Sequence, residues 1–148
     1  MREVRVENVR TDEWSKEQIE KFRAAGMATA LAHVALREAD GSRVFDILMG
    51  QPEARAIQSA VASVISVHSM VHDLYIETLR ALGASVTAAY ITGRDGQTFL
   101  GEVEVSTANG VASVKARPSD AVAVALKSKA PISVAEELLS APPAEDAK

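Results

Sequence analysis

The sequence has no cysteine, few aromatic residues and no excess of positive charge. Without cysteine the chain can form neither a disulfide framework nor a zinc–thiolate or cysteine-bound iron–sulfur centre, and it has no thiolate nucleophile. Aromatic residues make up 4% of the chain, too few for a platform of several aromatic faces that stacks single-stranded nucleic acid. The net charge of −4 disfavours nucleic-acid binding driven by bulk charge, so such binding would need a local basic site or a bridging metal.

Long apolar segments are also missing from the sequence. No apolar run approaches the roughly 18 to 20 residues that a membrane-spanning helix needs. The first seven residues alternate charged residues with valine and lack the apolar core of a signal peptide. The sequence therefore predicts a cytoplasmic protein that does not enter a membrane.

The length and overall composition of the chain are typical of one globular domain. The chain has 148 residues, of which 47% are hydrophobic and 24% are charged, and these values fit a folded chain. We expect one domain over residues 1–140. Residues 141–148, Ala-Pro-Pro-Ala-Glu-Asp-Ala-Lys, cannot form a core and are expected to be a disordered tail.

Apolar periodicity and turn residues predict strands and helices in mixed order. Strands are expected over residues 2–9, 29–38, 44–49, 85–92, 98–106 and 111–115, with a short extended piece at 131–134. Helices are expected over residues 11–25, 52–64, 70–82 and 118–127, with a last helical turn at 135–139. Hairpin turns are expected at Asp40-Gly41, Asp95-Gly96 and Asn109-Gly110. These connections predict an α+β fold, in which hairpins form a mostly antiparallel or mixed sheet and helices pack on it.

Two of the expected helices begin at proline, and a third ends at glycine. Pro52 and Pro118 suit the first turn of a helix, because their missing N–H would have no partner there. In the helix over residues 70–82, the spacing predicts that Leu74, Leu79 and Leu82 face inward and that Gly83 ends the helix.

A first polar cluster is the run His68-Ser69-Met70-Val71-His72-Asp73. Two histidines four residues apart lie on one face of a helix, at a spacing that metal ligands use. The zinc-protease pattern His-Glu-x-x-His is absent, however, and Asp73 would equally suit the first turn of a helix as a partner of the dipole. The cluster is compatible with a metal site and with ordinary helix-start chemistry.

A second polar cluster is the run Ala116-Arg117-Pro118-Ser119-Asp120-Ala121. Pro118 keeps Arg117 extended, which predicts that the guanidinium points away from the following helix. Ser119 and Asp120 then stand at the helix N-terminus, where backbone N–H groups bind anions. The same two residues are also ordinary capping residues, and Arg117 could simply pair with Asp120 or Asp73.

The two clusters, in this order, resemble the bifunctional nuclease domain family. The resemblance covers about residues 2–140 and is most specific in the Arg-Pro-Ser-Asp-Ala block at 117–121. Supporting segments are Gly50-Gln51-Pro52-Glu53-Ala54, His72-Asp73-Leu74, Ala81-Leu82-Gly83 and Pro131-Ile132-Ser133-Val134-Ala135-Glu136-Glu137. The resemblance implies an α/β sandwich-like domain that forms a homo-oligomer, most simply a dimer. It also implies nuclease activity on RNA and DNA, which is assigned to plant relatives.

The chain departs from the family pattern at two positions. His68 stands where the family commonly has arginine, so a fixed bidentate phosphate donor is replaced by an imidazole that is mostly neutral at pH 7. Lys115 stands where many relatives carry an acidic residue. The chain has therefore lost one arginine and one carboxylate of the family pattern.

The resemblance implies a metal-assisted phosphodiesterase that acts on RNA or DNA. In this reading Arg117 steadies the scissile phosphate and His72 acts as acid or base. The implied catalytic residues are His72, Asp73, Arg117, Ser119 and Asp120, and the implied ligands of Mg²⁺ or Mn²⁺ are Asp73, Asp120 and Glu53. The alternative is a non-catalytic oligomeric domain that binds an anionic ligand or a protein partner at the same helix start.

Overall fold

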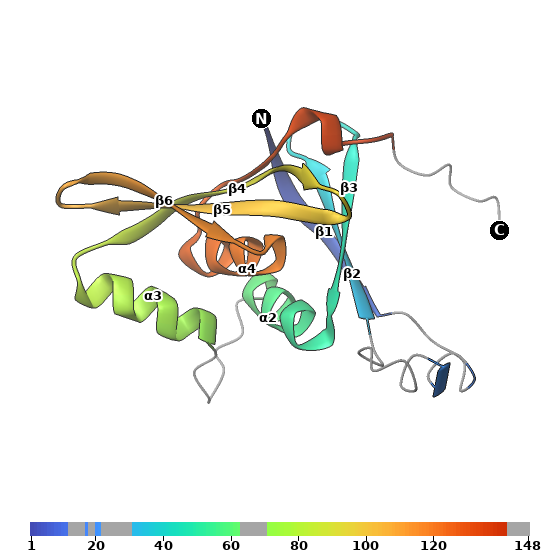
Figure 1. The fold of residues 1–148 in the computed structure, drawn as a ribbon, viewed down its shortest axis with the longest axis horizontal. Helices are drawn as coiled ribbons and strands as arrows, with labels where there is room; N and C mark the ends of the chain where they lie inside the picture. The colour runs from blue at the N-terminus through green and yellow to red at the C-terminus, as the bar shows by residue number, and fades with distance from the viewer. Residues whose placement is uncertain (12–16, 18–19, 22–30, 63–70, 142–148) are drawn as a thin grey trace.

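In the part of the chain that the structure describes, seven strands form one strongly twisted sheet, and three helices lie on one side of it (Figure 1). The computed structural model describes residues 1–11, 17, 20–21, 31–62 and 71–141. The strands are β1 Arg2–Thr11, β2 Leu31–Glu38, β3 Val44–Gly50, β4 Ser85–Asp95, β5 Thr98–Thr107, β6 Gly110–Ala116 and β7 Ile132–Val134. The helices are α2 Gln51–Val61, α3 Val71–Ala81 and α4 Pro118–Ser128, and a 3₁₀ turn, η1, spans Glu136–Leu138.

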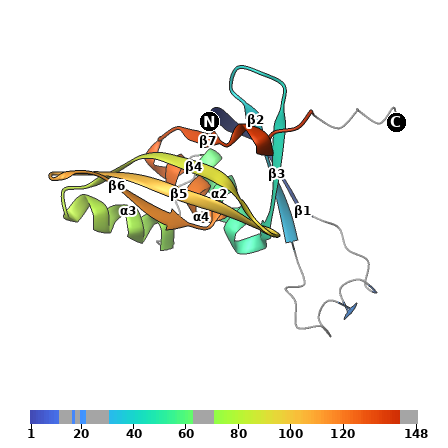
Figure 2. The ribbon, with the colours of Figure 1, turned by 45° about the horizontal axis from the view of Figure 1, so that its top comes forward.

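The strand order is β3-β2-β1-β7-β4-β5-β6. The three predicted hairpins are present, and each pairs antiparallel. Strand β7, only three residues long, lies between β1 and β4, antiparallel to the first and parallel to the second. In Figures 1 and 2, β4, β5 and β6 run crosswise to β1, β2 and β3. The predicted α+β fold with a mixed sheet is confirmed.

Most predicted elements lie within a few residues of the observed ones. The helix predicted over residues 11–25 and the tail predicted over 141–148 fall almost wholly outside the described residues.

Helix α4 lies at the centre of the hydrophobic core. Five consecutive residues, from Ala121 to Ala125, are all buried. Alanine alternates with valine in this run, and the small alanine side chains allow the helix to approach its neighbours closely. The core therefore holds the start of α4 in one place relative to the sheet.

Strand β5 passes very close to the junction between β6 and α4. A Cβ atom at Gly101 would lie 2.8 Å from the carbonyl oxygen of Ala116 and 3.2 Å from the nitrogen of Pro118. Only glycine fits such a close backbone approach without a shift. Gly101 thus helps to set the position at which Arg117 leaves the sheet.

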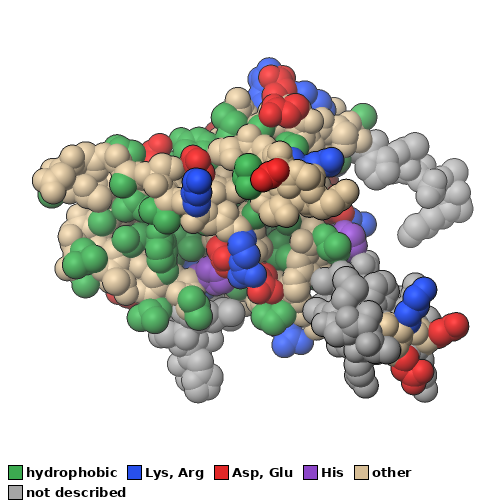
Figure 3. Space-filling model, in the orientation of Figure 1, with side chains coloured by type: hydrophobic (Ala, Val, Ile, Leu, Met, Phe, Trp, Pro, Cys, Tyr) green, Lys and Arg blue, Asp and Glu red, His purple; other side chains and the backbone are tan. Residues whose placement is uncertain are grey.

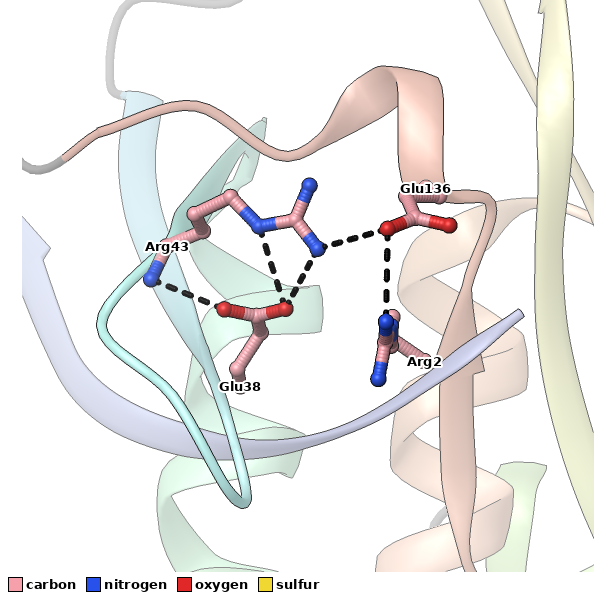
Figure 4. Close-up of polar contacts among 4 residues, drawn as sticks. All are labelled: Arg2, Glu38, Arg43 and Glu136. Atoms are coloured by element: carbon pink, nitrogen blue, oxygen red, sulfur yellow. Dashed lines mark hydrogen bonds and ion pairs between the residues drawn. The ribbon is translucent and has the colours of Figure 1, made fainter.

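Charged side chains join the N-terminal strand, the β2–β3 hairpin and the C-terminal turn (Figure 4). Arg43 donates to Glu38 at 2.7 Å and to Glu136 at 3.0 Å, and Arg2 lies 3.5 Å from Glu136. Hydrogen bonds from Arg43 lower the pKa of Glu38 although burial opposes this shift, and Arg43 together with Arg2 lowers the pKa of Glu136. The network links segments that are far apart in the sequence.

Of the three leucines of α3 and its C-terminal end that were predicted to face inward, Leu79 packs against the core. Leu74 is 63% exposed and Leu82 is 77% exposed, so the prediction that they face inward was wrong. The side that packs against the core carries Tyr75, Ile76 and Leu79. These residues recur at intervals of three to four and form one stripe of the helix. The predicted end of the helix was right, since Gly83 follows it with a positive φ of 75°.

Candidate functional site

The candidate site lies where β6 ends and α4 begins. Arg117 is the N-cap of α4, with φ −65° and ψ 145°, and Pro118 follows in the first turn. The predicted extended conformation of Arg117 is therefore present. The guanidinium nevertheless folds back over the helix start, because Asp120 lies one turn away. Its Nε donates to Asp120 Oδ2 at 2.8 Å and its Nη2 donates to Oδ1 at 3.2 Å, so the predicted direction of this side chain was wrong.

Asp120 also binds a residue from another helix. The Nε2 atom of His72, on α3, lies 2.9 Å from Asp120 Oδ1, across 48 residues of sequence. The His72 side chain is only 12% exposed, whereas that of Arg117 is 65% exposed. Asp120 therefore connects a nearly buried imidazole to a guanidinium that faces solvent.

The charge state of Asp120 follows from these contacts. Burial alone would raise the pKa of its carboxyl group, but hydrogen bonds and charge from Arg117 and His72 outweigh burial and lower that pKa. Asp120 is consequently ionised at neutral pH and acts only as an acceptor, so the shared hydrogen is assigned to His72 Nε2. The other ring nitrogen, Nδ1, is buried and has no hydrogen-bond partner among the described residues.

Asp73 is directed to a different part of α4. Its Oδ1 accepts a hydrogen bond from Lys127 Nζ at 3.0 Å. Lys127 lies two helical turns beyond Asp120, or about 10 Å along the helix axis. His72, and not its neighbour Asp73, is thus the α3 residue in contact with Asp120. Together the two contacts dock α3 on α4.

The three predicted metal ligands do not form one ligand set in the described part of the chain. Glu53 and Asp120 are joined through Arg117, whose Nη2 lies 3.5 Å from Glu53 Oε1. The guanidinium thus stands between these two carboxylates, and Asp73 pairs with Lys127. Across the described ranges, no three His, Cys, Asp or Glu side chains gather as a metal site. These residues do not fit a three-ligand Mg²⁺ or Mn²⁺ site in this arrangement. His68 lies outside the described residues.

Two cavities meet at Arg117. The smaller has a volume of about 320 Å³ and lies among α3, α4 and strands β5 and β6. The larger has a volume of about 640 Å³ and lies among β3, the start of α2 and the β4–β5 turn. Ser119, which is buried, and Glu53 line the larger cavity, whereas His72 and Asp120 line the smaller one. Arg117 lines both.

Two residues of the site were missed from the sequence. Tyr75 lines the smaller cavity beside His72, and its position one helical turn after His72 was a usable signal. Lys127 binds Asp73, but nothing local in the sequence indicates a contact between residues 54 positions apart.

The family model of the bifunctional nuclease domain matches residues 34–145, a range that includes both polar clusters and Glu53. The chain belongs to the bifunctional nuclease domain family. The resemblance seen in the sequence is confirmed, and His72, Arg117 and Asp120 all lie inside the matched part of this bifunctional nuclease domain.

Two proteins from strains of Mycobacterium tuberculosis are similar to this bifunctional nuclease domain protein. Each is 38% identical to it over 105 residues, which is 71% of this chain and 62% of the relative. The alignment therefore spans less than two thirds of the relatives' length, and both relatives are uncharacterised. Within the described ranges, none of the helices is both long and apolar enough to cross a membrane.

Proposed function

We propose that this bifunctional nuclease domain cleaves phosphodiester bonds of RNA or DNA at the start of α4. The observation that carries the proposal is the chain of contacts from His72 through Asp120 to Arg117. Asp120 lines a cavity and contacts both side chains, so the proposed acid–base group and the proposed phosphate ligand share one carboxylate. The family membership supports the same chemistry.

Arg117 is the proposed phosphate ligand. Its contacts with Asp120 and Glu53 use Nε and Nη2, and no contact of Nη1 is found within the described part of the chain. An exposed guanidinium at a helix N-terminus offers the remaining N–H groups to an anion, and the helix dipole favours the same charge. The side chain can therefore bind a phosphate while it stays held by Asp120.

His72 is the proposed acid–base group. Asp120 holds the imidazole through Nε2, as a carboxylate commonly orients a catalytic histidine. When the single proton of a neutral imidazole sits on Nε2, the Nδ1 atom is a hydrogen-bond acceptor. A buried ring nitrogen without a partner costs roughly 1–3 kcal/mol. A substrate or water O–H that reached Nδ1 would gain that interaction.

Stimulation by Mg²⁺ or Mn²⁺ belongs to the proposal through family resemblance alone. Because the carboxylates of Glu53, Asp73 and Asp120 do not form one ligand set, we assign no step to a metal. The cleavage assay therefore compares activity with and without Mg²⁺ or Mn²⁺.

The test is cleavage of labelled RNA and DNA by the purified protein, with Mg²⁺, with Mn²⁺ and with a chelator. His72→Gln keeps an amide donor for Asp120 but cannot transfer a proton, so cleavage should fall about 100-fold or more. Arg117→Lys should also weaken cleavage, since a point charge replaces a planar fork of donors. Arg80→Ala, which removes an exposed pair with Glu77, is the matched control and should cleave normally. Failure of the unaltered protein to cleave either substrate in all three conditions would refute the proposal.

One observation favours the second candidate function, a non-catalytic oligomeric domain that binds an anionic ligand or a protein partner. Arg117 is already paired with two carboxylates, an arrangement that is stable without a reaction. In that case inorganic phosphate or an oligonucleotide would bind at Arg117, and no substitution of His72 would change a rate.

We also propose that the domain forms a homo-oligomer, most simply a dimer. Hydrophobic side chains gather over α3 and the β5–β6 hairpin (Figure 3). Leu74, Leu82 and Val111 are all strongly exposed there, and β6 is an edge of the sheet. Exposed hydrophobic surfaces and unpaired sheet edges of this kind are typical of sites that bind another protein chain. Light scattering should give the mass of a dimer, and Leu74→Lys should shift it toward the monomer.

A further inference from the structure

The smaller cavity has a lining that phosphodiester cleavage alone does not explain. Most of its wall is apolar, and its polar groups come from His72, Lys115, Arg117 and Asp120. The apolar wall is made of Val71, Tyr75, Val103, Val114 and Val124. A site that bound only a phosphate would have little use for four valines and a tyrosine.

We propose that this cavity binds one unstacked nucleobase of a single-stranded substrate, while Arg117 holds the adjoining phosphate. The proposal rests on the proposed function and names its substrate class. Apolar pockets of about 300 Å³ or more, with a few polar groups at one side, are typical of small flat ligands, and about 320 Å³ is available here. A base inside a duplex is paired and stacked, whereas a single strand can splay a base into a pocket.

The residues that line the cavity suit a nucleobase and the phosphate next to it. Tyr75 offers a ring, and burial raises the pKa of its hydroxyl, so the side chain is neutral. Aromatic rings stack on the face of any base.

Two positively charged residues are among those that line the cavity. Lys115 is the next-to-last residue of β6, and Arg117 is the N-cap of α4. Two cations suffice for two phosphates of one strand, but the net charge of −4 provides no wider field for a duplex.

The experiment measures binding apart from cleavage. The probes are short fluorescein-labelled RNA and DNA strands with phosphorothioate linkages that resist hydrolysis, each tested alone and as a duplex. The single strands should bind about 10-fold more tightly than the duplexes. The logarithm of the binding constant should fall with the logarithm of salt concentration with a slope of about −1.4, as two phosphate contacts on a single strand require. Lys115→Ala should reduce that slope to about −0.7.

A matched pair of tryptophan substitutions tests the cavity itself. Val114 and Leu100 are both 44% exposed and lie on neighbouring strands, but only Val114 lines the cavity. Val114→Trp should fill the rim and weaken single-strand binding about 10-fold or more, whereas Leu100→Trp should bind as the unaltered protein does. Circular dichroism verifies that both variants fold.

The outcomes separate this inference from the proposed function. Tight single-strand binding that Val114→Trp abolishes, without cleavage of any unmodified strand, would support the base site and refute the nuclease. Cleavage of single strands and duplexes at equal rates, with Val114→Trp and Leu100→Trp equally active, would support the nuclease and overturn the base site. Duplex binding as tight as single-strand binding would also overturn it.

Discussion

His72 and Asp120 lie on different helices and 48 residues apart in sequence, yet their side chains are 2.9 Å from each other. The contact joins α3, none of whose residues is fully buried, to α4, which forms the centre of the core. The candidate site is thus also part of what holds α3 in place. Substitutions at this site therefore need a stability measurement beside every activity measurement.

Asp120→Asn separates a functional role of this carboxylate from a structural one. Asp120 is one-third exposed and Arg117 is mostly exposed, so solvent replaces much of what the ion pair provides. We expect the free energy of unfolding to fall by about 1 kcal/mol and cleavage to be lost, because Arg117 and His72 are no longer held together by a charge. Urea unfolding and the cleavage assay measure the two effects. A loss of roughly 3 kcal/mol or more without any activity to lose would instead identify a structural ion pair.

Asp73→Ala should destabilise the protein more than the loss of an ordinary surface pair. Lys127 is only 12% exposed, so the substitution leaves a nearly buried ammonium without this carboxylate. We expect a loss of about 2 kcal/mol in the free energy of unfolding. Glu77→Ala breaks the exposed pair with Arg80 on the same helix and should change stability by less than about 0.5 kcal/mol. Equal effects of the two substitutions in urea unfolding would contradict this account.

Gly101→Ala should shift the backbone that positions the candidate site. The new Cβ atom would meet the carbonyl oxygen of Ala116 at 2.8 Å, so the β6–α4 junction must shift and move Arg117 with it. We expect a loss of more than about 1 kcal/mol in stability together with weaker cleavage. Gly93→Ala, on the neighbouring strand β4, is the control, because nothing lies within 4 Å of its added Cβ and its φ is not positive. Gly93→Ala should be close to neutral.

Stability should fall in acid because three carboxyl groups have lowered pKa values in the folded protein. They are Glu38, Asp120 and Glu136. A group whose folded pKa lies below its unfolded value stabilises the fold fully above the unfolded value, which is 4.5 for glutamate and 3.8 for aspartate. That stabilisation is lost as pH falls through the lower, folded pKa.

Arg43→Gln tests the source of this acid sensitivity. The substitution removes the cation that lowers the pKa of Glu38 and contributes to that of Glu136 (Figure 4). Urea unfolding between pH 7 and pH 3 should show lower stability at pH 7 and a weaker dependence on pH below about 4.5. Arg55→Gln, at an exposed position on α2, should keep the full dependence. An unchanged acid profile in Arg43→Gln would contradict the assignment.

The sequence by itself determined most of the secondary structure. Turn residues such as Asp95-Gly96 and Asn109-Gly110 define hairpins through local backbone preferences, and Pro52 and Pro118 mark helix starts because proline lacks an N–H. The contact of Arg117 with Asp120 was among the alternatives, since it joins residues three apart. All of these features depend on neighbours in the chain, so a local pattern carries them.

Only the tertiary structure decided which distant residues meet. The three-residue strand β7 lies between β1 and β4, and no pattern within so short a segment specifies two partners. The exposed side of α3 was mispredicted at Leu74 and Leu82, because apolar spacing shows a helix's hydrophobic positions but not the rotation at which it docks. The same rotation brings His72 to Asp120 and Asp73 to Lys127. Adjacent residues on a helix point about 100° apart, so the docking of α3 on α4 alone determined which of the two joins the candidate site.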